Sequence, residues 1–199
     1  MRRRQFLPLL AGPIIAFPAV RSAFAWPDQP IKLVVPFTPG TGPDIIARFV
    51  AERLTAKLGQ PVVVENVAGA SGNIGSQQVA RAKPDGHTLM SSVNTLVMNA
   101  SLYKNLPYDP VADFAPLGLS AWGSLVLVAH PSQKPNTLAE LVEAAKAAPK
   151  TLTYGSPGVG TPHHLSMALV EAASGIELLH VPYRGTAGAV QDLLGGQIG

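Results

Sequence analysis

The 199-residue sequence contains no cysteine, which excludes disulfide bonds, thiol chemistry and a lipid-carrying N-terminal cysteine. Beyond residue 25 it has no apolar run long enough to cross a bilayer. It also lacks the His-Glu-x-x-His spacing of many zinc sites and the Gly-Lys-Ser/Thr that ends a Walker loop. We therefore expect no metal, no nucleotide and no other cofactor.

Residues 1–25 have the pattern of an export signal. A basic start at Arg2–Arg4 precedes a proline-interrupted apolar stretch over Phe6–Val20, and Ala23–Ala25 matches an A-x-A cleavage site. The apolar stretch is too short to be a membrane anchor. We expect a periplasmic mature chain that begins at Trp26, exported by the general secretory or the twin-arginine route.

Removal of residues 1–25 reverses the sign of the net charge, which is +3 for the complete sequence. Loss of the signal's four arginines lowers Lys plus Arg from 15 to 11, against 12 Asp plus Glu, which gives −1. The mature chain thus has no electrostatic bias toward nucleic acid or an anionic membrane, and we expect neither as a partner.

Short apolar segments alternate with helical patterns along residues 26–199. The sequence predicts strands over 31–35, 62–64, 87–92, 114–120, 125–129, 151–154 and 176–181. It predicts helices over 44–58, 74–81, 137–149, 161–175 and 186–194. This alternation is typical of an α/β fold with largely parallel sheets.

Local signals define several helix boundaries. Thr137 and Glu140 form a capping box at one helix start, and Gly59 and Gly175 are the expected C-terminal stops of two other helices. In the first helix the apolar side chains at positions 45, 46, 49, 50 and 54 fall on one face, which we expect to be buried.

Four loops rich in Gly, Pro, Ser and Thr each connect a predicted strand to a predicted helix. They cover residues 36–44, 69–75, 154–161 and 182–186. In parallel α/β sheets such loops lie at the carboxyl ends of the strands. A helix start presents unpaired N–H groups and a partial positive charge, and small residues let a ligand approach that backbone. Convergence of these loops predicts a binding site for a small anion that needs no catalytic side chain.

The candidate ligand-binding residues lie in these loops and after the third strand. They are Phe37, Thr38, Gly40, Thr41, Ser71, Gly72, Asn73, Ser92, Asn94, Ser156, Gly160, Thr161, His164, Tyr183 and Arg184. Their amides and hydroxyls suit a carboxylate, with which Arg184 could also pair. Asp44 is expected to cap a helix, because its charge would repel an anion. Ordinary capped turns and a solvated arginine are the alternatives.

An enzyme of the α/β hydrolase type, using Ser156 with His163 or His164, is the alternative to a binding protein. Residues 155–161 fit neither the G-x-S-x-G nucleophile motif nor the G-x-G-x-x-G dinucleotide motif. Adjacent histidines on a helix point about a quarter-turn apart, which suits a shared metal ion poorly. We therefore expect no catalytic and no metal-binding residues.

Eight blocks of sequence resemble the exported solute-binding receptors of tripartite tricarboxylate transporters, the Bordetella uptake gene family. The blocks are residues 30–37, 40–44, 64–75, 83–86, 106–114, 154–156, 180–185 and 192–197. Each glycine loop alone is a weak signal, but this many blocks in this order is specific. The resemblance covers nearly all of residues 26–199.

The resemblance implies a two-lobe, periplasmic-binding-protein-like fold of type II that closes on its solute like a Venus flytrap. Lobe one would span residues 26–124 and lobe two residues 125–199, with a carboxylate-bearing metabolite between them. Family members are longer, so the resemblance also implies that the chain is C-terminally truncated: lobe two would be incomplete, and lobe one would lack its C-terminal return segment. The complete receptor would be monomeric and would deliver its solute to membrane transporter subunits. A ligand-sensing module and a non-functional truncated homologue remain alternatives.

Overall fold

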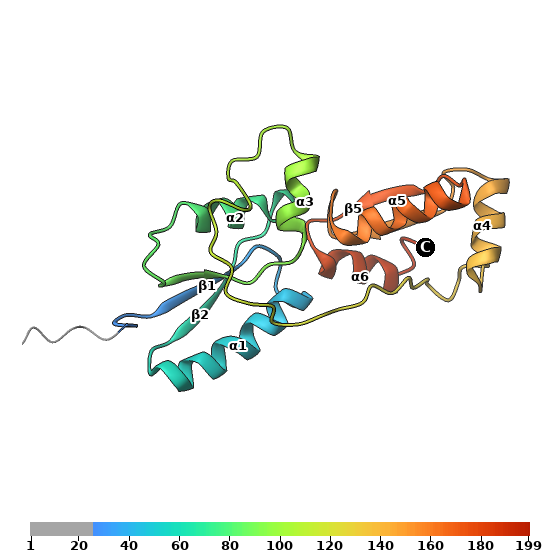
Figure 1. The fold of residues 1–199 in the computed structure, drawn as a ribbon. Helices are drawn as coiled ribbons and strands as arrows, with labels where there is room; N and C mark the ends of the chain where they lie inside the picture. The colour runs from blue at the N-terminus through green and yellow to red at the C-terminus, as the bar shows by residue number, and fades with distance from the viewer. Residues whose placement is uncertain (1–25) are drawn as a thin grey trace, which may run out of the picture.

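The computed structural model describes residues 26–199, which form two groups of helices and strands (Figure 1). Each group is built around its own parallel sheet, one of three strands and one of two. This confirms the predicted α/β class with parallel sheets. No helix within residues 26–199 combines the length and the apolarity needed to span a membrane. The predicted export signal, residues 1–25, lies outside the described residues.

The first sheet has the strand order β2-β1-β3. Its strands are β1 (Ile31–Val35), β2 (Val62–Asn66) and β3 (Thr88–Met90). The helical segments of this group are α1 (Gly42–Leu58), the 3-10 turn η1 (Ala70–Gly72), α2 (Asn73–Ala80) and α3 (Thr95–Leu102). Because every pair of neighbouring strands is parallel, the loops that follow the three strands leave the same edge of the sheet.

The core of the first group lies between β1 and α1. Val35 is completely buried, and the small side chains of Ala47 and Ala51 pack in the same cluster. The buried face predicted for α1 is wrong in part, because Ile45 and Phe49 are 59% and 57% exposed. Alanine lets a helix approach a sheet closely, and burial of the alanine face turns the larger side chains outward.

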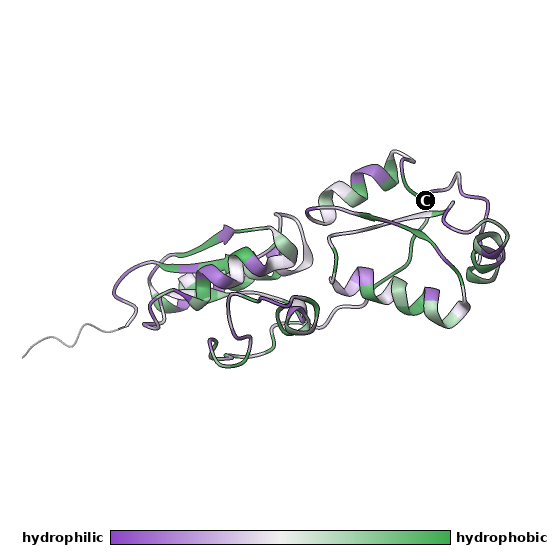
Figure 2. Cartoon of the chain, turned by 90° about the horizontal axis from the view of Figure 1, so that it is seen from above, coloured by the Kyte–Doolittle hydropathy of each residue, from purple (hydrophilic) through white to green (hydrophobic). Residues whose placement is uncertain are grey.

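The second sheet pairs β4 (Thr153–Ser156) with β5 (Leu179–Pro182). Its helices are α4 (Leu138–Ala147), α5 (Pro162–Ser174) and α6 (Thr186–Leu194). Viewed from above, the strands run between two of these helices, and both α5 and α6 contact β4 (Figure 2). A second buried apolar cluster consists of Ala145, Tyr154, Ile176 and Leu178.

Three helix boundaries confirm the signals in the sequence. The Glu140 N–H donates to Thr137 Oγ1 over 3.2 Å, as the capping box requires. Gly59 and Gly175 end α1 and α5 with φ values of +68° and +63°. Glycine adopts this left-handed conformation at little cost, so it ends a helix readily.

Helix α3 is an element that the sequence did not predict. Its residues mix β-branched, polar and apolar side chains without a clear amphipathic pattern. Thr95 and Asn99, one turn apart, are each only 1% exposed. The helix therefore buries polar side chains on one face, and hydropathy periodicity does not detect such a face.

The strands predicted over 114–120 and 125–129 are wrong for this structure. Residues 114–130 contain no strand and form an extended connection between the two groups (Figure 1). Leu117 and Trp122 in this segment are 82% and 90% exposed. A strand needs a hydrogen-bonding neighbour, and no described residue supplies one here, although the apolar pattern is that of a strand.

Gly75 provides a test of how closely α2 packs against the loop after β1. A Cβ at this position would lie 2.8 Å from Val67 O and 2.9 Å from Pro36 Cα, both backbone atoms. We expect Gly75→Ala to lower the free energy of unfolding by about 1–3 kcal/mol, because backbone must move to admit the methyl group. Gly42→Ala is the matched control, since a Cβ there meets nothing within 4 Å. Equal urea-unfolding midpoints for the two variants would contradict this packing.

Candidate functional site

Four loops from the two sheets meet where the two groups of elements join. Loop one (36–44) follows β1, loop two (69–75) follows β2, loop three (154–161) includes the end of β4, and loop four (182–186) follows β5. They lead into α1, α2, α5 and α6 respectively. The parallel pairing of the strands places each loop at a carboxyl end.

Loop two touches both loop one and loop three. A Cβ on Gly72 would lie 3.5 Å from Phe37 Cζ, so these two loops pack directly. The Ser71 hydroxyl donates a hydrogen bond to Val159 O in loop three. Segments 88 residues apart in the chain are thereby joined across the boundary between the two sheets.

Loop four closes the ring of contacts. A Cβ on Gly158 in loop three would lie 3.5 Å from Tyr183 O in loop four. Gly185 in loop four packs against the Thr38 side chain of loop one so closely that a methyl group would collide with it. The four loops therefore contact one another in turn: one, two, three, four and back to one.

Loop one is held in shape by the buried carboxylate of Asp44. Its oxygens accept hydrogen bonds from the Gly40 N–H (2.8 Å), Arg48 Nε (3.1 Å) and Asn66 Nδ2 (2.9 Å). Burial alone would raise the pKa of Asp44, but these donors and the Arg48 charge together hold that pKa below its usual value. Asp44 thus holds the start of α1 as expected, but it is not the capping residue: the N-cap is Thr41, whose side chain makes no capping hydrogen bond.

Loop two is held by a buried polar network beneath it. Asn73 Oδ1 accepts hydrogen bonds from Asn99 Nδ2 (2.6 Å) and from the Tyr108 hydroxyl (2.8 Å). Asn99 Nδ2 also donates to Ser71 O over 3.1 Å. Asn99 and Tyr108 are not among the site residues predicted from the sequence. The spacing of four residues between Thr95 and Asn99 is a signal only where the segment is known to be a helix, and α3 was not predicted.

The Ser156 hydroxyl in loop three is hydrogen-bonded to neighbouring groups of the protein. Its hydroxyl donates to Gly158 O (3.1 Å) and accepts from the Gly158 N–H (3.2 Å), while His180 Nε2 lies 2.7 Å away. One hydroxyl hydrogen cannot serve both acceptors, so His180 donates when the serine bonds Gly158. The proposed pairing of Ser156 with His163 or His164 is therefore wrong: the structure pairs it with His180, and Ser156 is 1% exposed.

Three aromatic rings stack beside Ser156. The His180 ring lies between the other two. Its centroid is 4.3 Å from that of His164 and 4.8 Å from that of Tyr154. Burial, followed by the neighbouring His164, lowers the pKa of His180. His164 Nδ1 accepts a hydrogen bond from the Gly160 N–H over 3.1 Å. His164, a candidate ligand-binding residue, therefore stabilises loop three in this structure.

The two candidate ligand-binding residues of loop four, Tyr183 and Arg184, lie in different surroundings. The Tyr183 hydroxyl donates to Asp192 Oδ2 over 2.6 Å, and this hydrogen bond is the main reason that the pKa of Tyr183 is raised. Arg184 is exposed. Among residues 26–199 no carboxylate pairs with Arg184, which leaves its guanidinium in solvent.

Several main-chain amides expected to meet an anion have acceptors inside the loops. The N–H groups of Gly40, Gly72, Gly160 and Thr161 donate to Asp44 Oδ2, Gly69 O, His164 Nδ1 and Gly158 O respectively. The hydroxyls of Thr41 and Thr161 likewise donate to Thr38 O and Gly158 O. In this arrangement these donors are not available to a ligand, because the loops satisfy them internally.

Other polar groups at the junction remain uncommitted. Thr38 Oγ1, Thr95 Oγ1 and Asn99 Oδ1 are buried and have no hydrogen-bond partner among the described residues. Ser92 and Asn94, the two candidates after β3, precede α3; Ser92 Oγ makes only a 3.4 Å contact with Val93 O, and Asn94 is exposed. Buried side-chain oxygens are therefore among the polar atoms that the described residues leave uncommitted at the junction.

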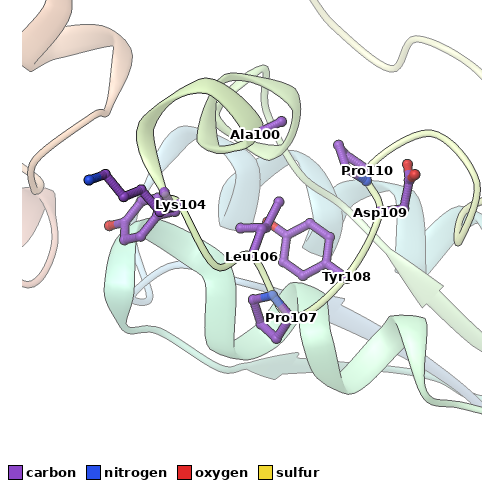
Figure 3. A pocket seen from close by; sticks show the side chains of 8 residues that line it. Ala100, Lys104, Leu106, Pro107, Tyr108, Asp109 and Pro110 are labelled. Carbon is purple, nitrogen blue, oxygen red and sulfur yellow. The ribbon is translucent and has the colours of Figure 1, made fainter.

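A separate hollow of about 550 Å³ lies beside α3 (Figure 3). Lys104, Tyr108 and Asp109 are among its lining residues. The Asp109 carboxylate accepts the N–H groups of Ala112 and Val111, which lower its pKa. The hollow contains none of the residues from the four loops. Within residues 26–199 no cluster of three or more His, Cys, Asp or Glu residues is arranged to hold a metal ion.

Two parallel α/β sheets whose loops meet at their carboxyl ends have the architecture of a periplasmic binding protein. A solved structure of that class, the periplasmic binding protein BugD, superposes with a TM-score of 0.75 at 38% sequence identity. The match covers 87% of this chain and 58% of that chain.

The sequence profile described as the tripartite tricarboxylate transporter family receptor matches residues 46–199. The chain belongs to this family, as its sequence blocks indicated. A UPF0065 protein of Pseudomonas sp. strain P51 is 42% identical over 174 residues, covering 87% of this chain and 52% of the relative. MatC of Rhodopseudomonas palustris, solved with bound malate, matches with a TM-score of 0.79 at 30% identity, covering 87% of this chain and 59% of MatC.

The chain thus spans about half the length of the curated relative that it matches and under two thirds of these solved chains. The comparisons confirm the family and the periplasmic-binding-protein fold. The family is described as a receptor, which agrees with a binding role rather than a catalytic one.

The Asp44 cluster predicts a pH-dependent contribution to stability. We expect Asp44→Asn to lower the free energy of unfolding at pH 7 by about 1–3 kcal/mol, since charge-assisted hydrogen bonds are lost. The folded-state pKa lies below the unfolded value, so this contribution is present above about pH 4 and disappears as pH falls through the folded pKa. Urea unfolding should therefore show wild type and variant converging toward pH 2.

Glu52→Gln, on the exposed face of the same helix, is the control for a change of one charge. Its effect on stability should be within about 0.5 kcal/mol at either pH. A gap between Asp44→Asn and wild type that stays constant from pH 7 to pH 2 would show that the carboxylate charge is not what holds loop one.

Proposed function

We propose that this protein is an extracytoplasmic receptor that captures a small carboxylate-bearing metabolite at the junction of the four loops. It delivers this solute to a membrane transporter of the tripartite tricarboxylate type. The observation that carries the proposal is the closed ring of contacts between loops of two separate sheets, with buried hydroxyls that have no hydrogen-bond partner among residues 26–199.

The contacts to the carboxylate come mainly from side chains. Thr38 and Thr95 have uncommitted hydroxyls, and Ser71 can exchange its hydrogen bond to Val159 for one to the solute. Micromolar affinity requires about 8 kcal/mol. A hydrogen bond to a charged group contributes about 1.5–3 kcal/mol, so three such donors supply most of that energy. Arg184, exposed beside the ring, adds charge attraction during approach.

The receptor works as two lobes, residues 26–124 and 125–199, and the boundary between them falls within the extended segment over residues 114–130. The loops touch one another in this structure, so the solute enters when the lobes separate and is enclosed when they close. Export by the signal over residues 1–25 places the receptor in the periplasm, where it works as a monomer.

The relatives support the chemical class of the solute. MatC, which matches over 87% of this chain, was solved with malate, a dicarboxylate. The family description names tricarboxylate transport. A carboxylate therefore fits both the hydroxyl-rich loop ring and the ligand chemistry of a similar protein.

Titration calorimetry of the purified chain against succinate, malate and citrate tests the proposed function. We expect at least one acid to bind with micromolar affinity. Thr38→Val replaces the hydroxyl with a methyl group of similar size and should weaken that binding about tenfold. Ser166→Ala, an exposed hydroxyl on α5, is the control and should leave affinity unchanged. Absence of heat with every acid, under conditions where urea unfolding shows a folded chain, would overturn the proposal.

Ser156→Ala separates the receptor from a hydrolase. We expect the purified chain to show no turnover of activated esters that depends on Ser156, because that hydroxyl is buried and bonded to Gly158. The variant should instead lose about 1–2 kcal/mol of stability through its missing hydrogen bonds. Ester turnover that disappears in Ser156→Ala, with stability retained, would favour the enzyme.

A further inference from the structure

The amide of Asn99 is fixed in one orientation. Its Nδ2 donates to Ser71 O over 3.1 Å and to Asn73 Oδ1 over 2.6 Å. Ser71 O is a main-chain carbonyl and can only accept, so the nitrogen must face it. Both amide hydrogens are therefore committed to loop two, and the position of Asn99 Oδ1 follows from them.

Asn99 Oδ1 is a buried acceptor that no described residue satisfies. The side chain is 1% exposed, and its oxygen has no hydrogen-bond donor among residues 26–199. It faces loop three, since a Cβ on Gly160 would lie 3.8 Å from it. The Gly160 N–H does not serve it, because that group donates to His164 Nδ1. A buried acceptor without a hydrogen bond costs free energy. A ligand group that donates to it is therefore strongly preferred over one that does not.

A carboxylate cannot supply that donor. An ionised carboxylate only accepts hydrogen bonds, as does the amide oxygen of Asn99, and two acceptors repel. The Thr95 hydroxyl, one turn earlier on α3, is also buried and has no partner among the described residues, but a hydroxyl can donate to a carboxylate. Thr95 is therefore able to donate to a carboxylate, whereas Asn99 Oδ1 needs a donor.

We infer that Asn99 determines specificity by accepting a hydrogen bond from a hydroxyl or ammonium group carried on the same solute as the carboxylate. This inference rests on the proposed function and narrows its substrate class to hydroxy or amino acids of the dicarboxylate or tricarboxylate type. Plain carboxylic acids of the same length leave Asn99 unsatisfied and bind more weakly.

Matched pairs of acids test this in the purified chain. Malate differs from succinate, and citrate from tricarballylate, by one hydroxyl; aspartate differs from succinate by one ammonium group. We expect the donor-bearing acid to bind about tenfold or more tightly in at least one pair, measured by calorimetry. The comparisons of malate and of aspartate with succinate show whether Asn99 recognises a hydroxyl or an ammonium donor. Equal affinities within all three pairs would overturn the inference, including the case in which water satisfies Asn99.

Two variants separate recognition from support of loop two. Asn99→Leu removes the acceptor at similar volume and should bring the affinity ratio of the discriminating pair close to one. Tyr108→Phe removes a hydrogen bond to Asn73 in the same network without altering Asn99 Oδ1, so it should leave that ratio unchanged. Equal weakening of both acids in Asn99→Leu, with the ratio preserved, would show a structural role and would overturn the inference.

The outcomes also distinguish this inference from the proposed function. If the acids bind but the affinities are equal within all three pairs, the receptor function stands and the inferred role of Asn99 is wrong. If no acid binds to the folded wild-type chain, both fall. If Asn99→Leu does not fold, the wild-type ratio of paired acids still decides.

Discussion

Parallel pairing of strands is the constraint on which the rest of the structure depends. β1 pairs with both β2 and β3, and β4 pairs with β5, and each of these pairs is parallel. Parallel strands must release their connecting loops at a common edge, and each loop then opens the next helix. The loop ring exists because two such edges face each other. A single antiparallel strand in place of β2 or β5 would send one of the four loops to the far side.

Internal satisfaction of the loops determines what they can offer a ligand. Asp44, Asn73 and Ser156 each collect hydrogen bonds from neighbouring backbone or side chains, and several loop amides, such as those of Gly40, Gly72 and Gly160, donate within the chain. This fixes the loop conformations before any solute arrives, which reduces the entropy lost on binding. Among residues 26–199, buried side-chain oxygens such as those of Thr38 and Asn99 are left without hydrogen-bond partners, and under the proposed function these oxygens meet the solute.

Most elements follow from local patterns in the sequence. The strand at 31–35 and the helices ending at Gly59 and Gly175 lie where hydropathy and glycine predict them. The errors arise where a partner decides the outcome. Residues 114–129 have a strand-like composition but no neighbour among the described residues, and α3 is stabilised by buried Thr95 and Asn99, whose polarity conceals the helix. The exposed Ile45 shows the same limit, since packing chose the alanine face of α1.

The amino-acid sequence by itself determined the α/β class, the positions of the four loops and, through its ordered blocks, the family. These depend on local backbone preference and on short motifs, which neighbouring residues encode. Only the tertiary structure decided that Ser156 pairs with His180, that the Gly160 amide is occupied, and that Asn99 Oδ1 lies beside loop three with no donor among residues 26–199. Each of these is a contact between residues distant in the chain or a matter of orientation, and spacing along a sequence does not specify which groups meet or which hydrogen-bond partners are already taken.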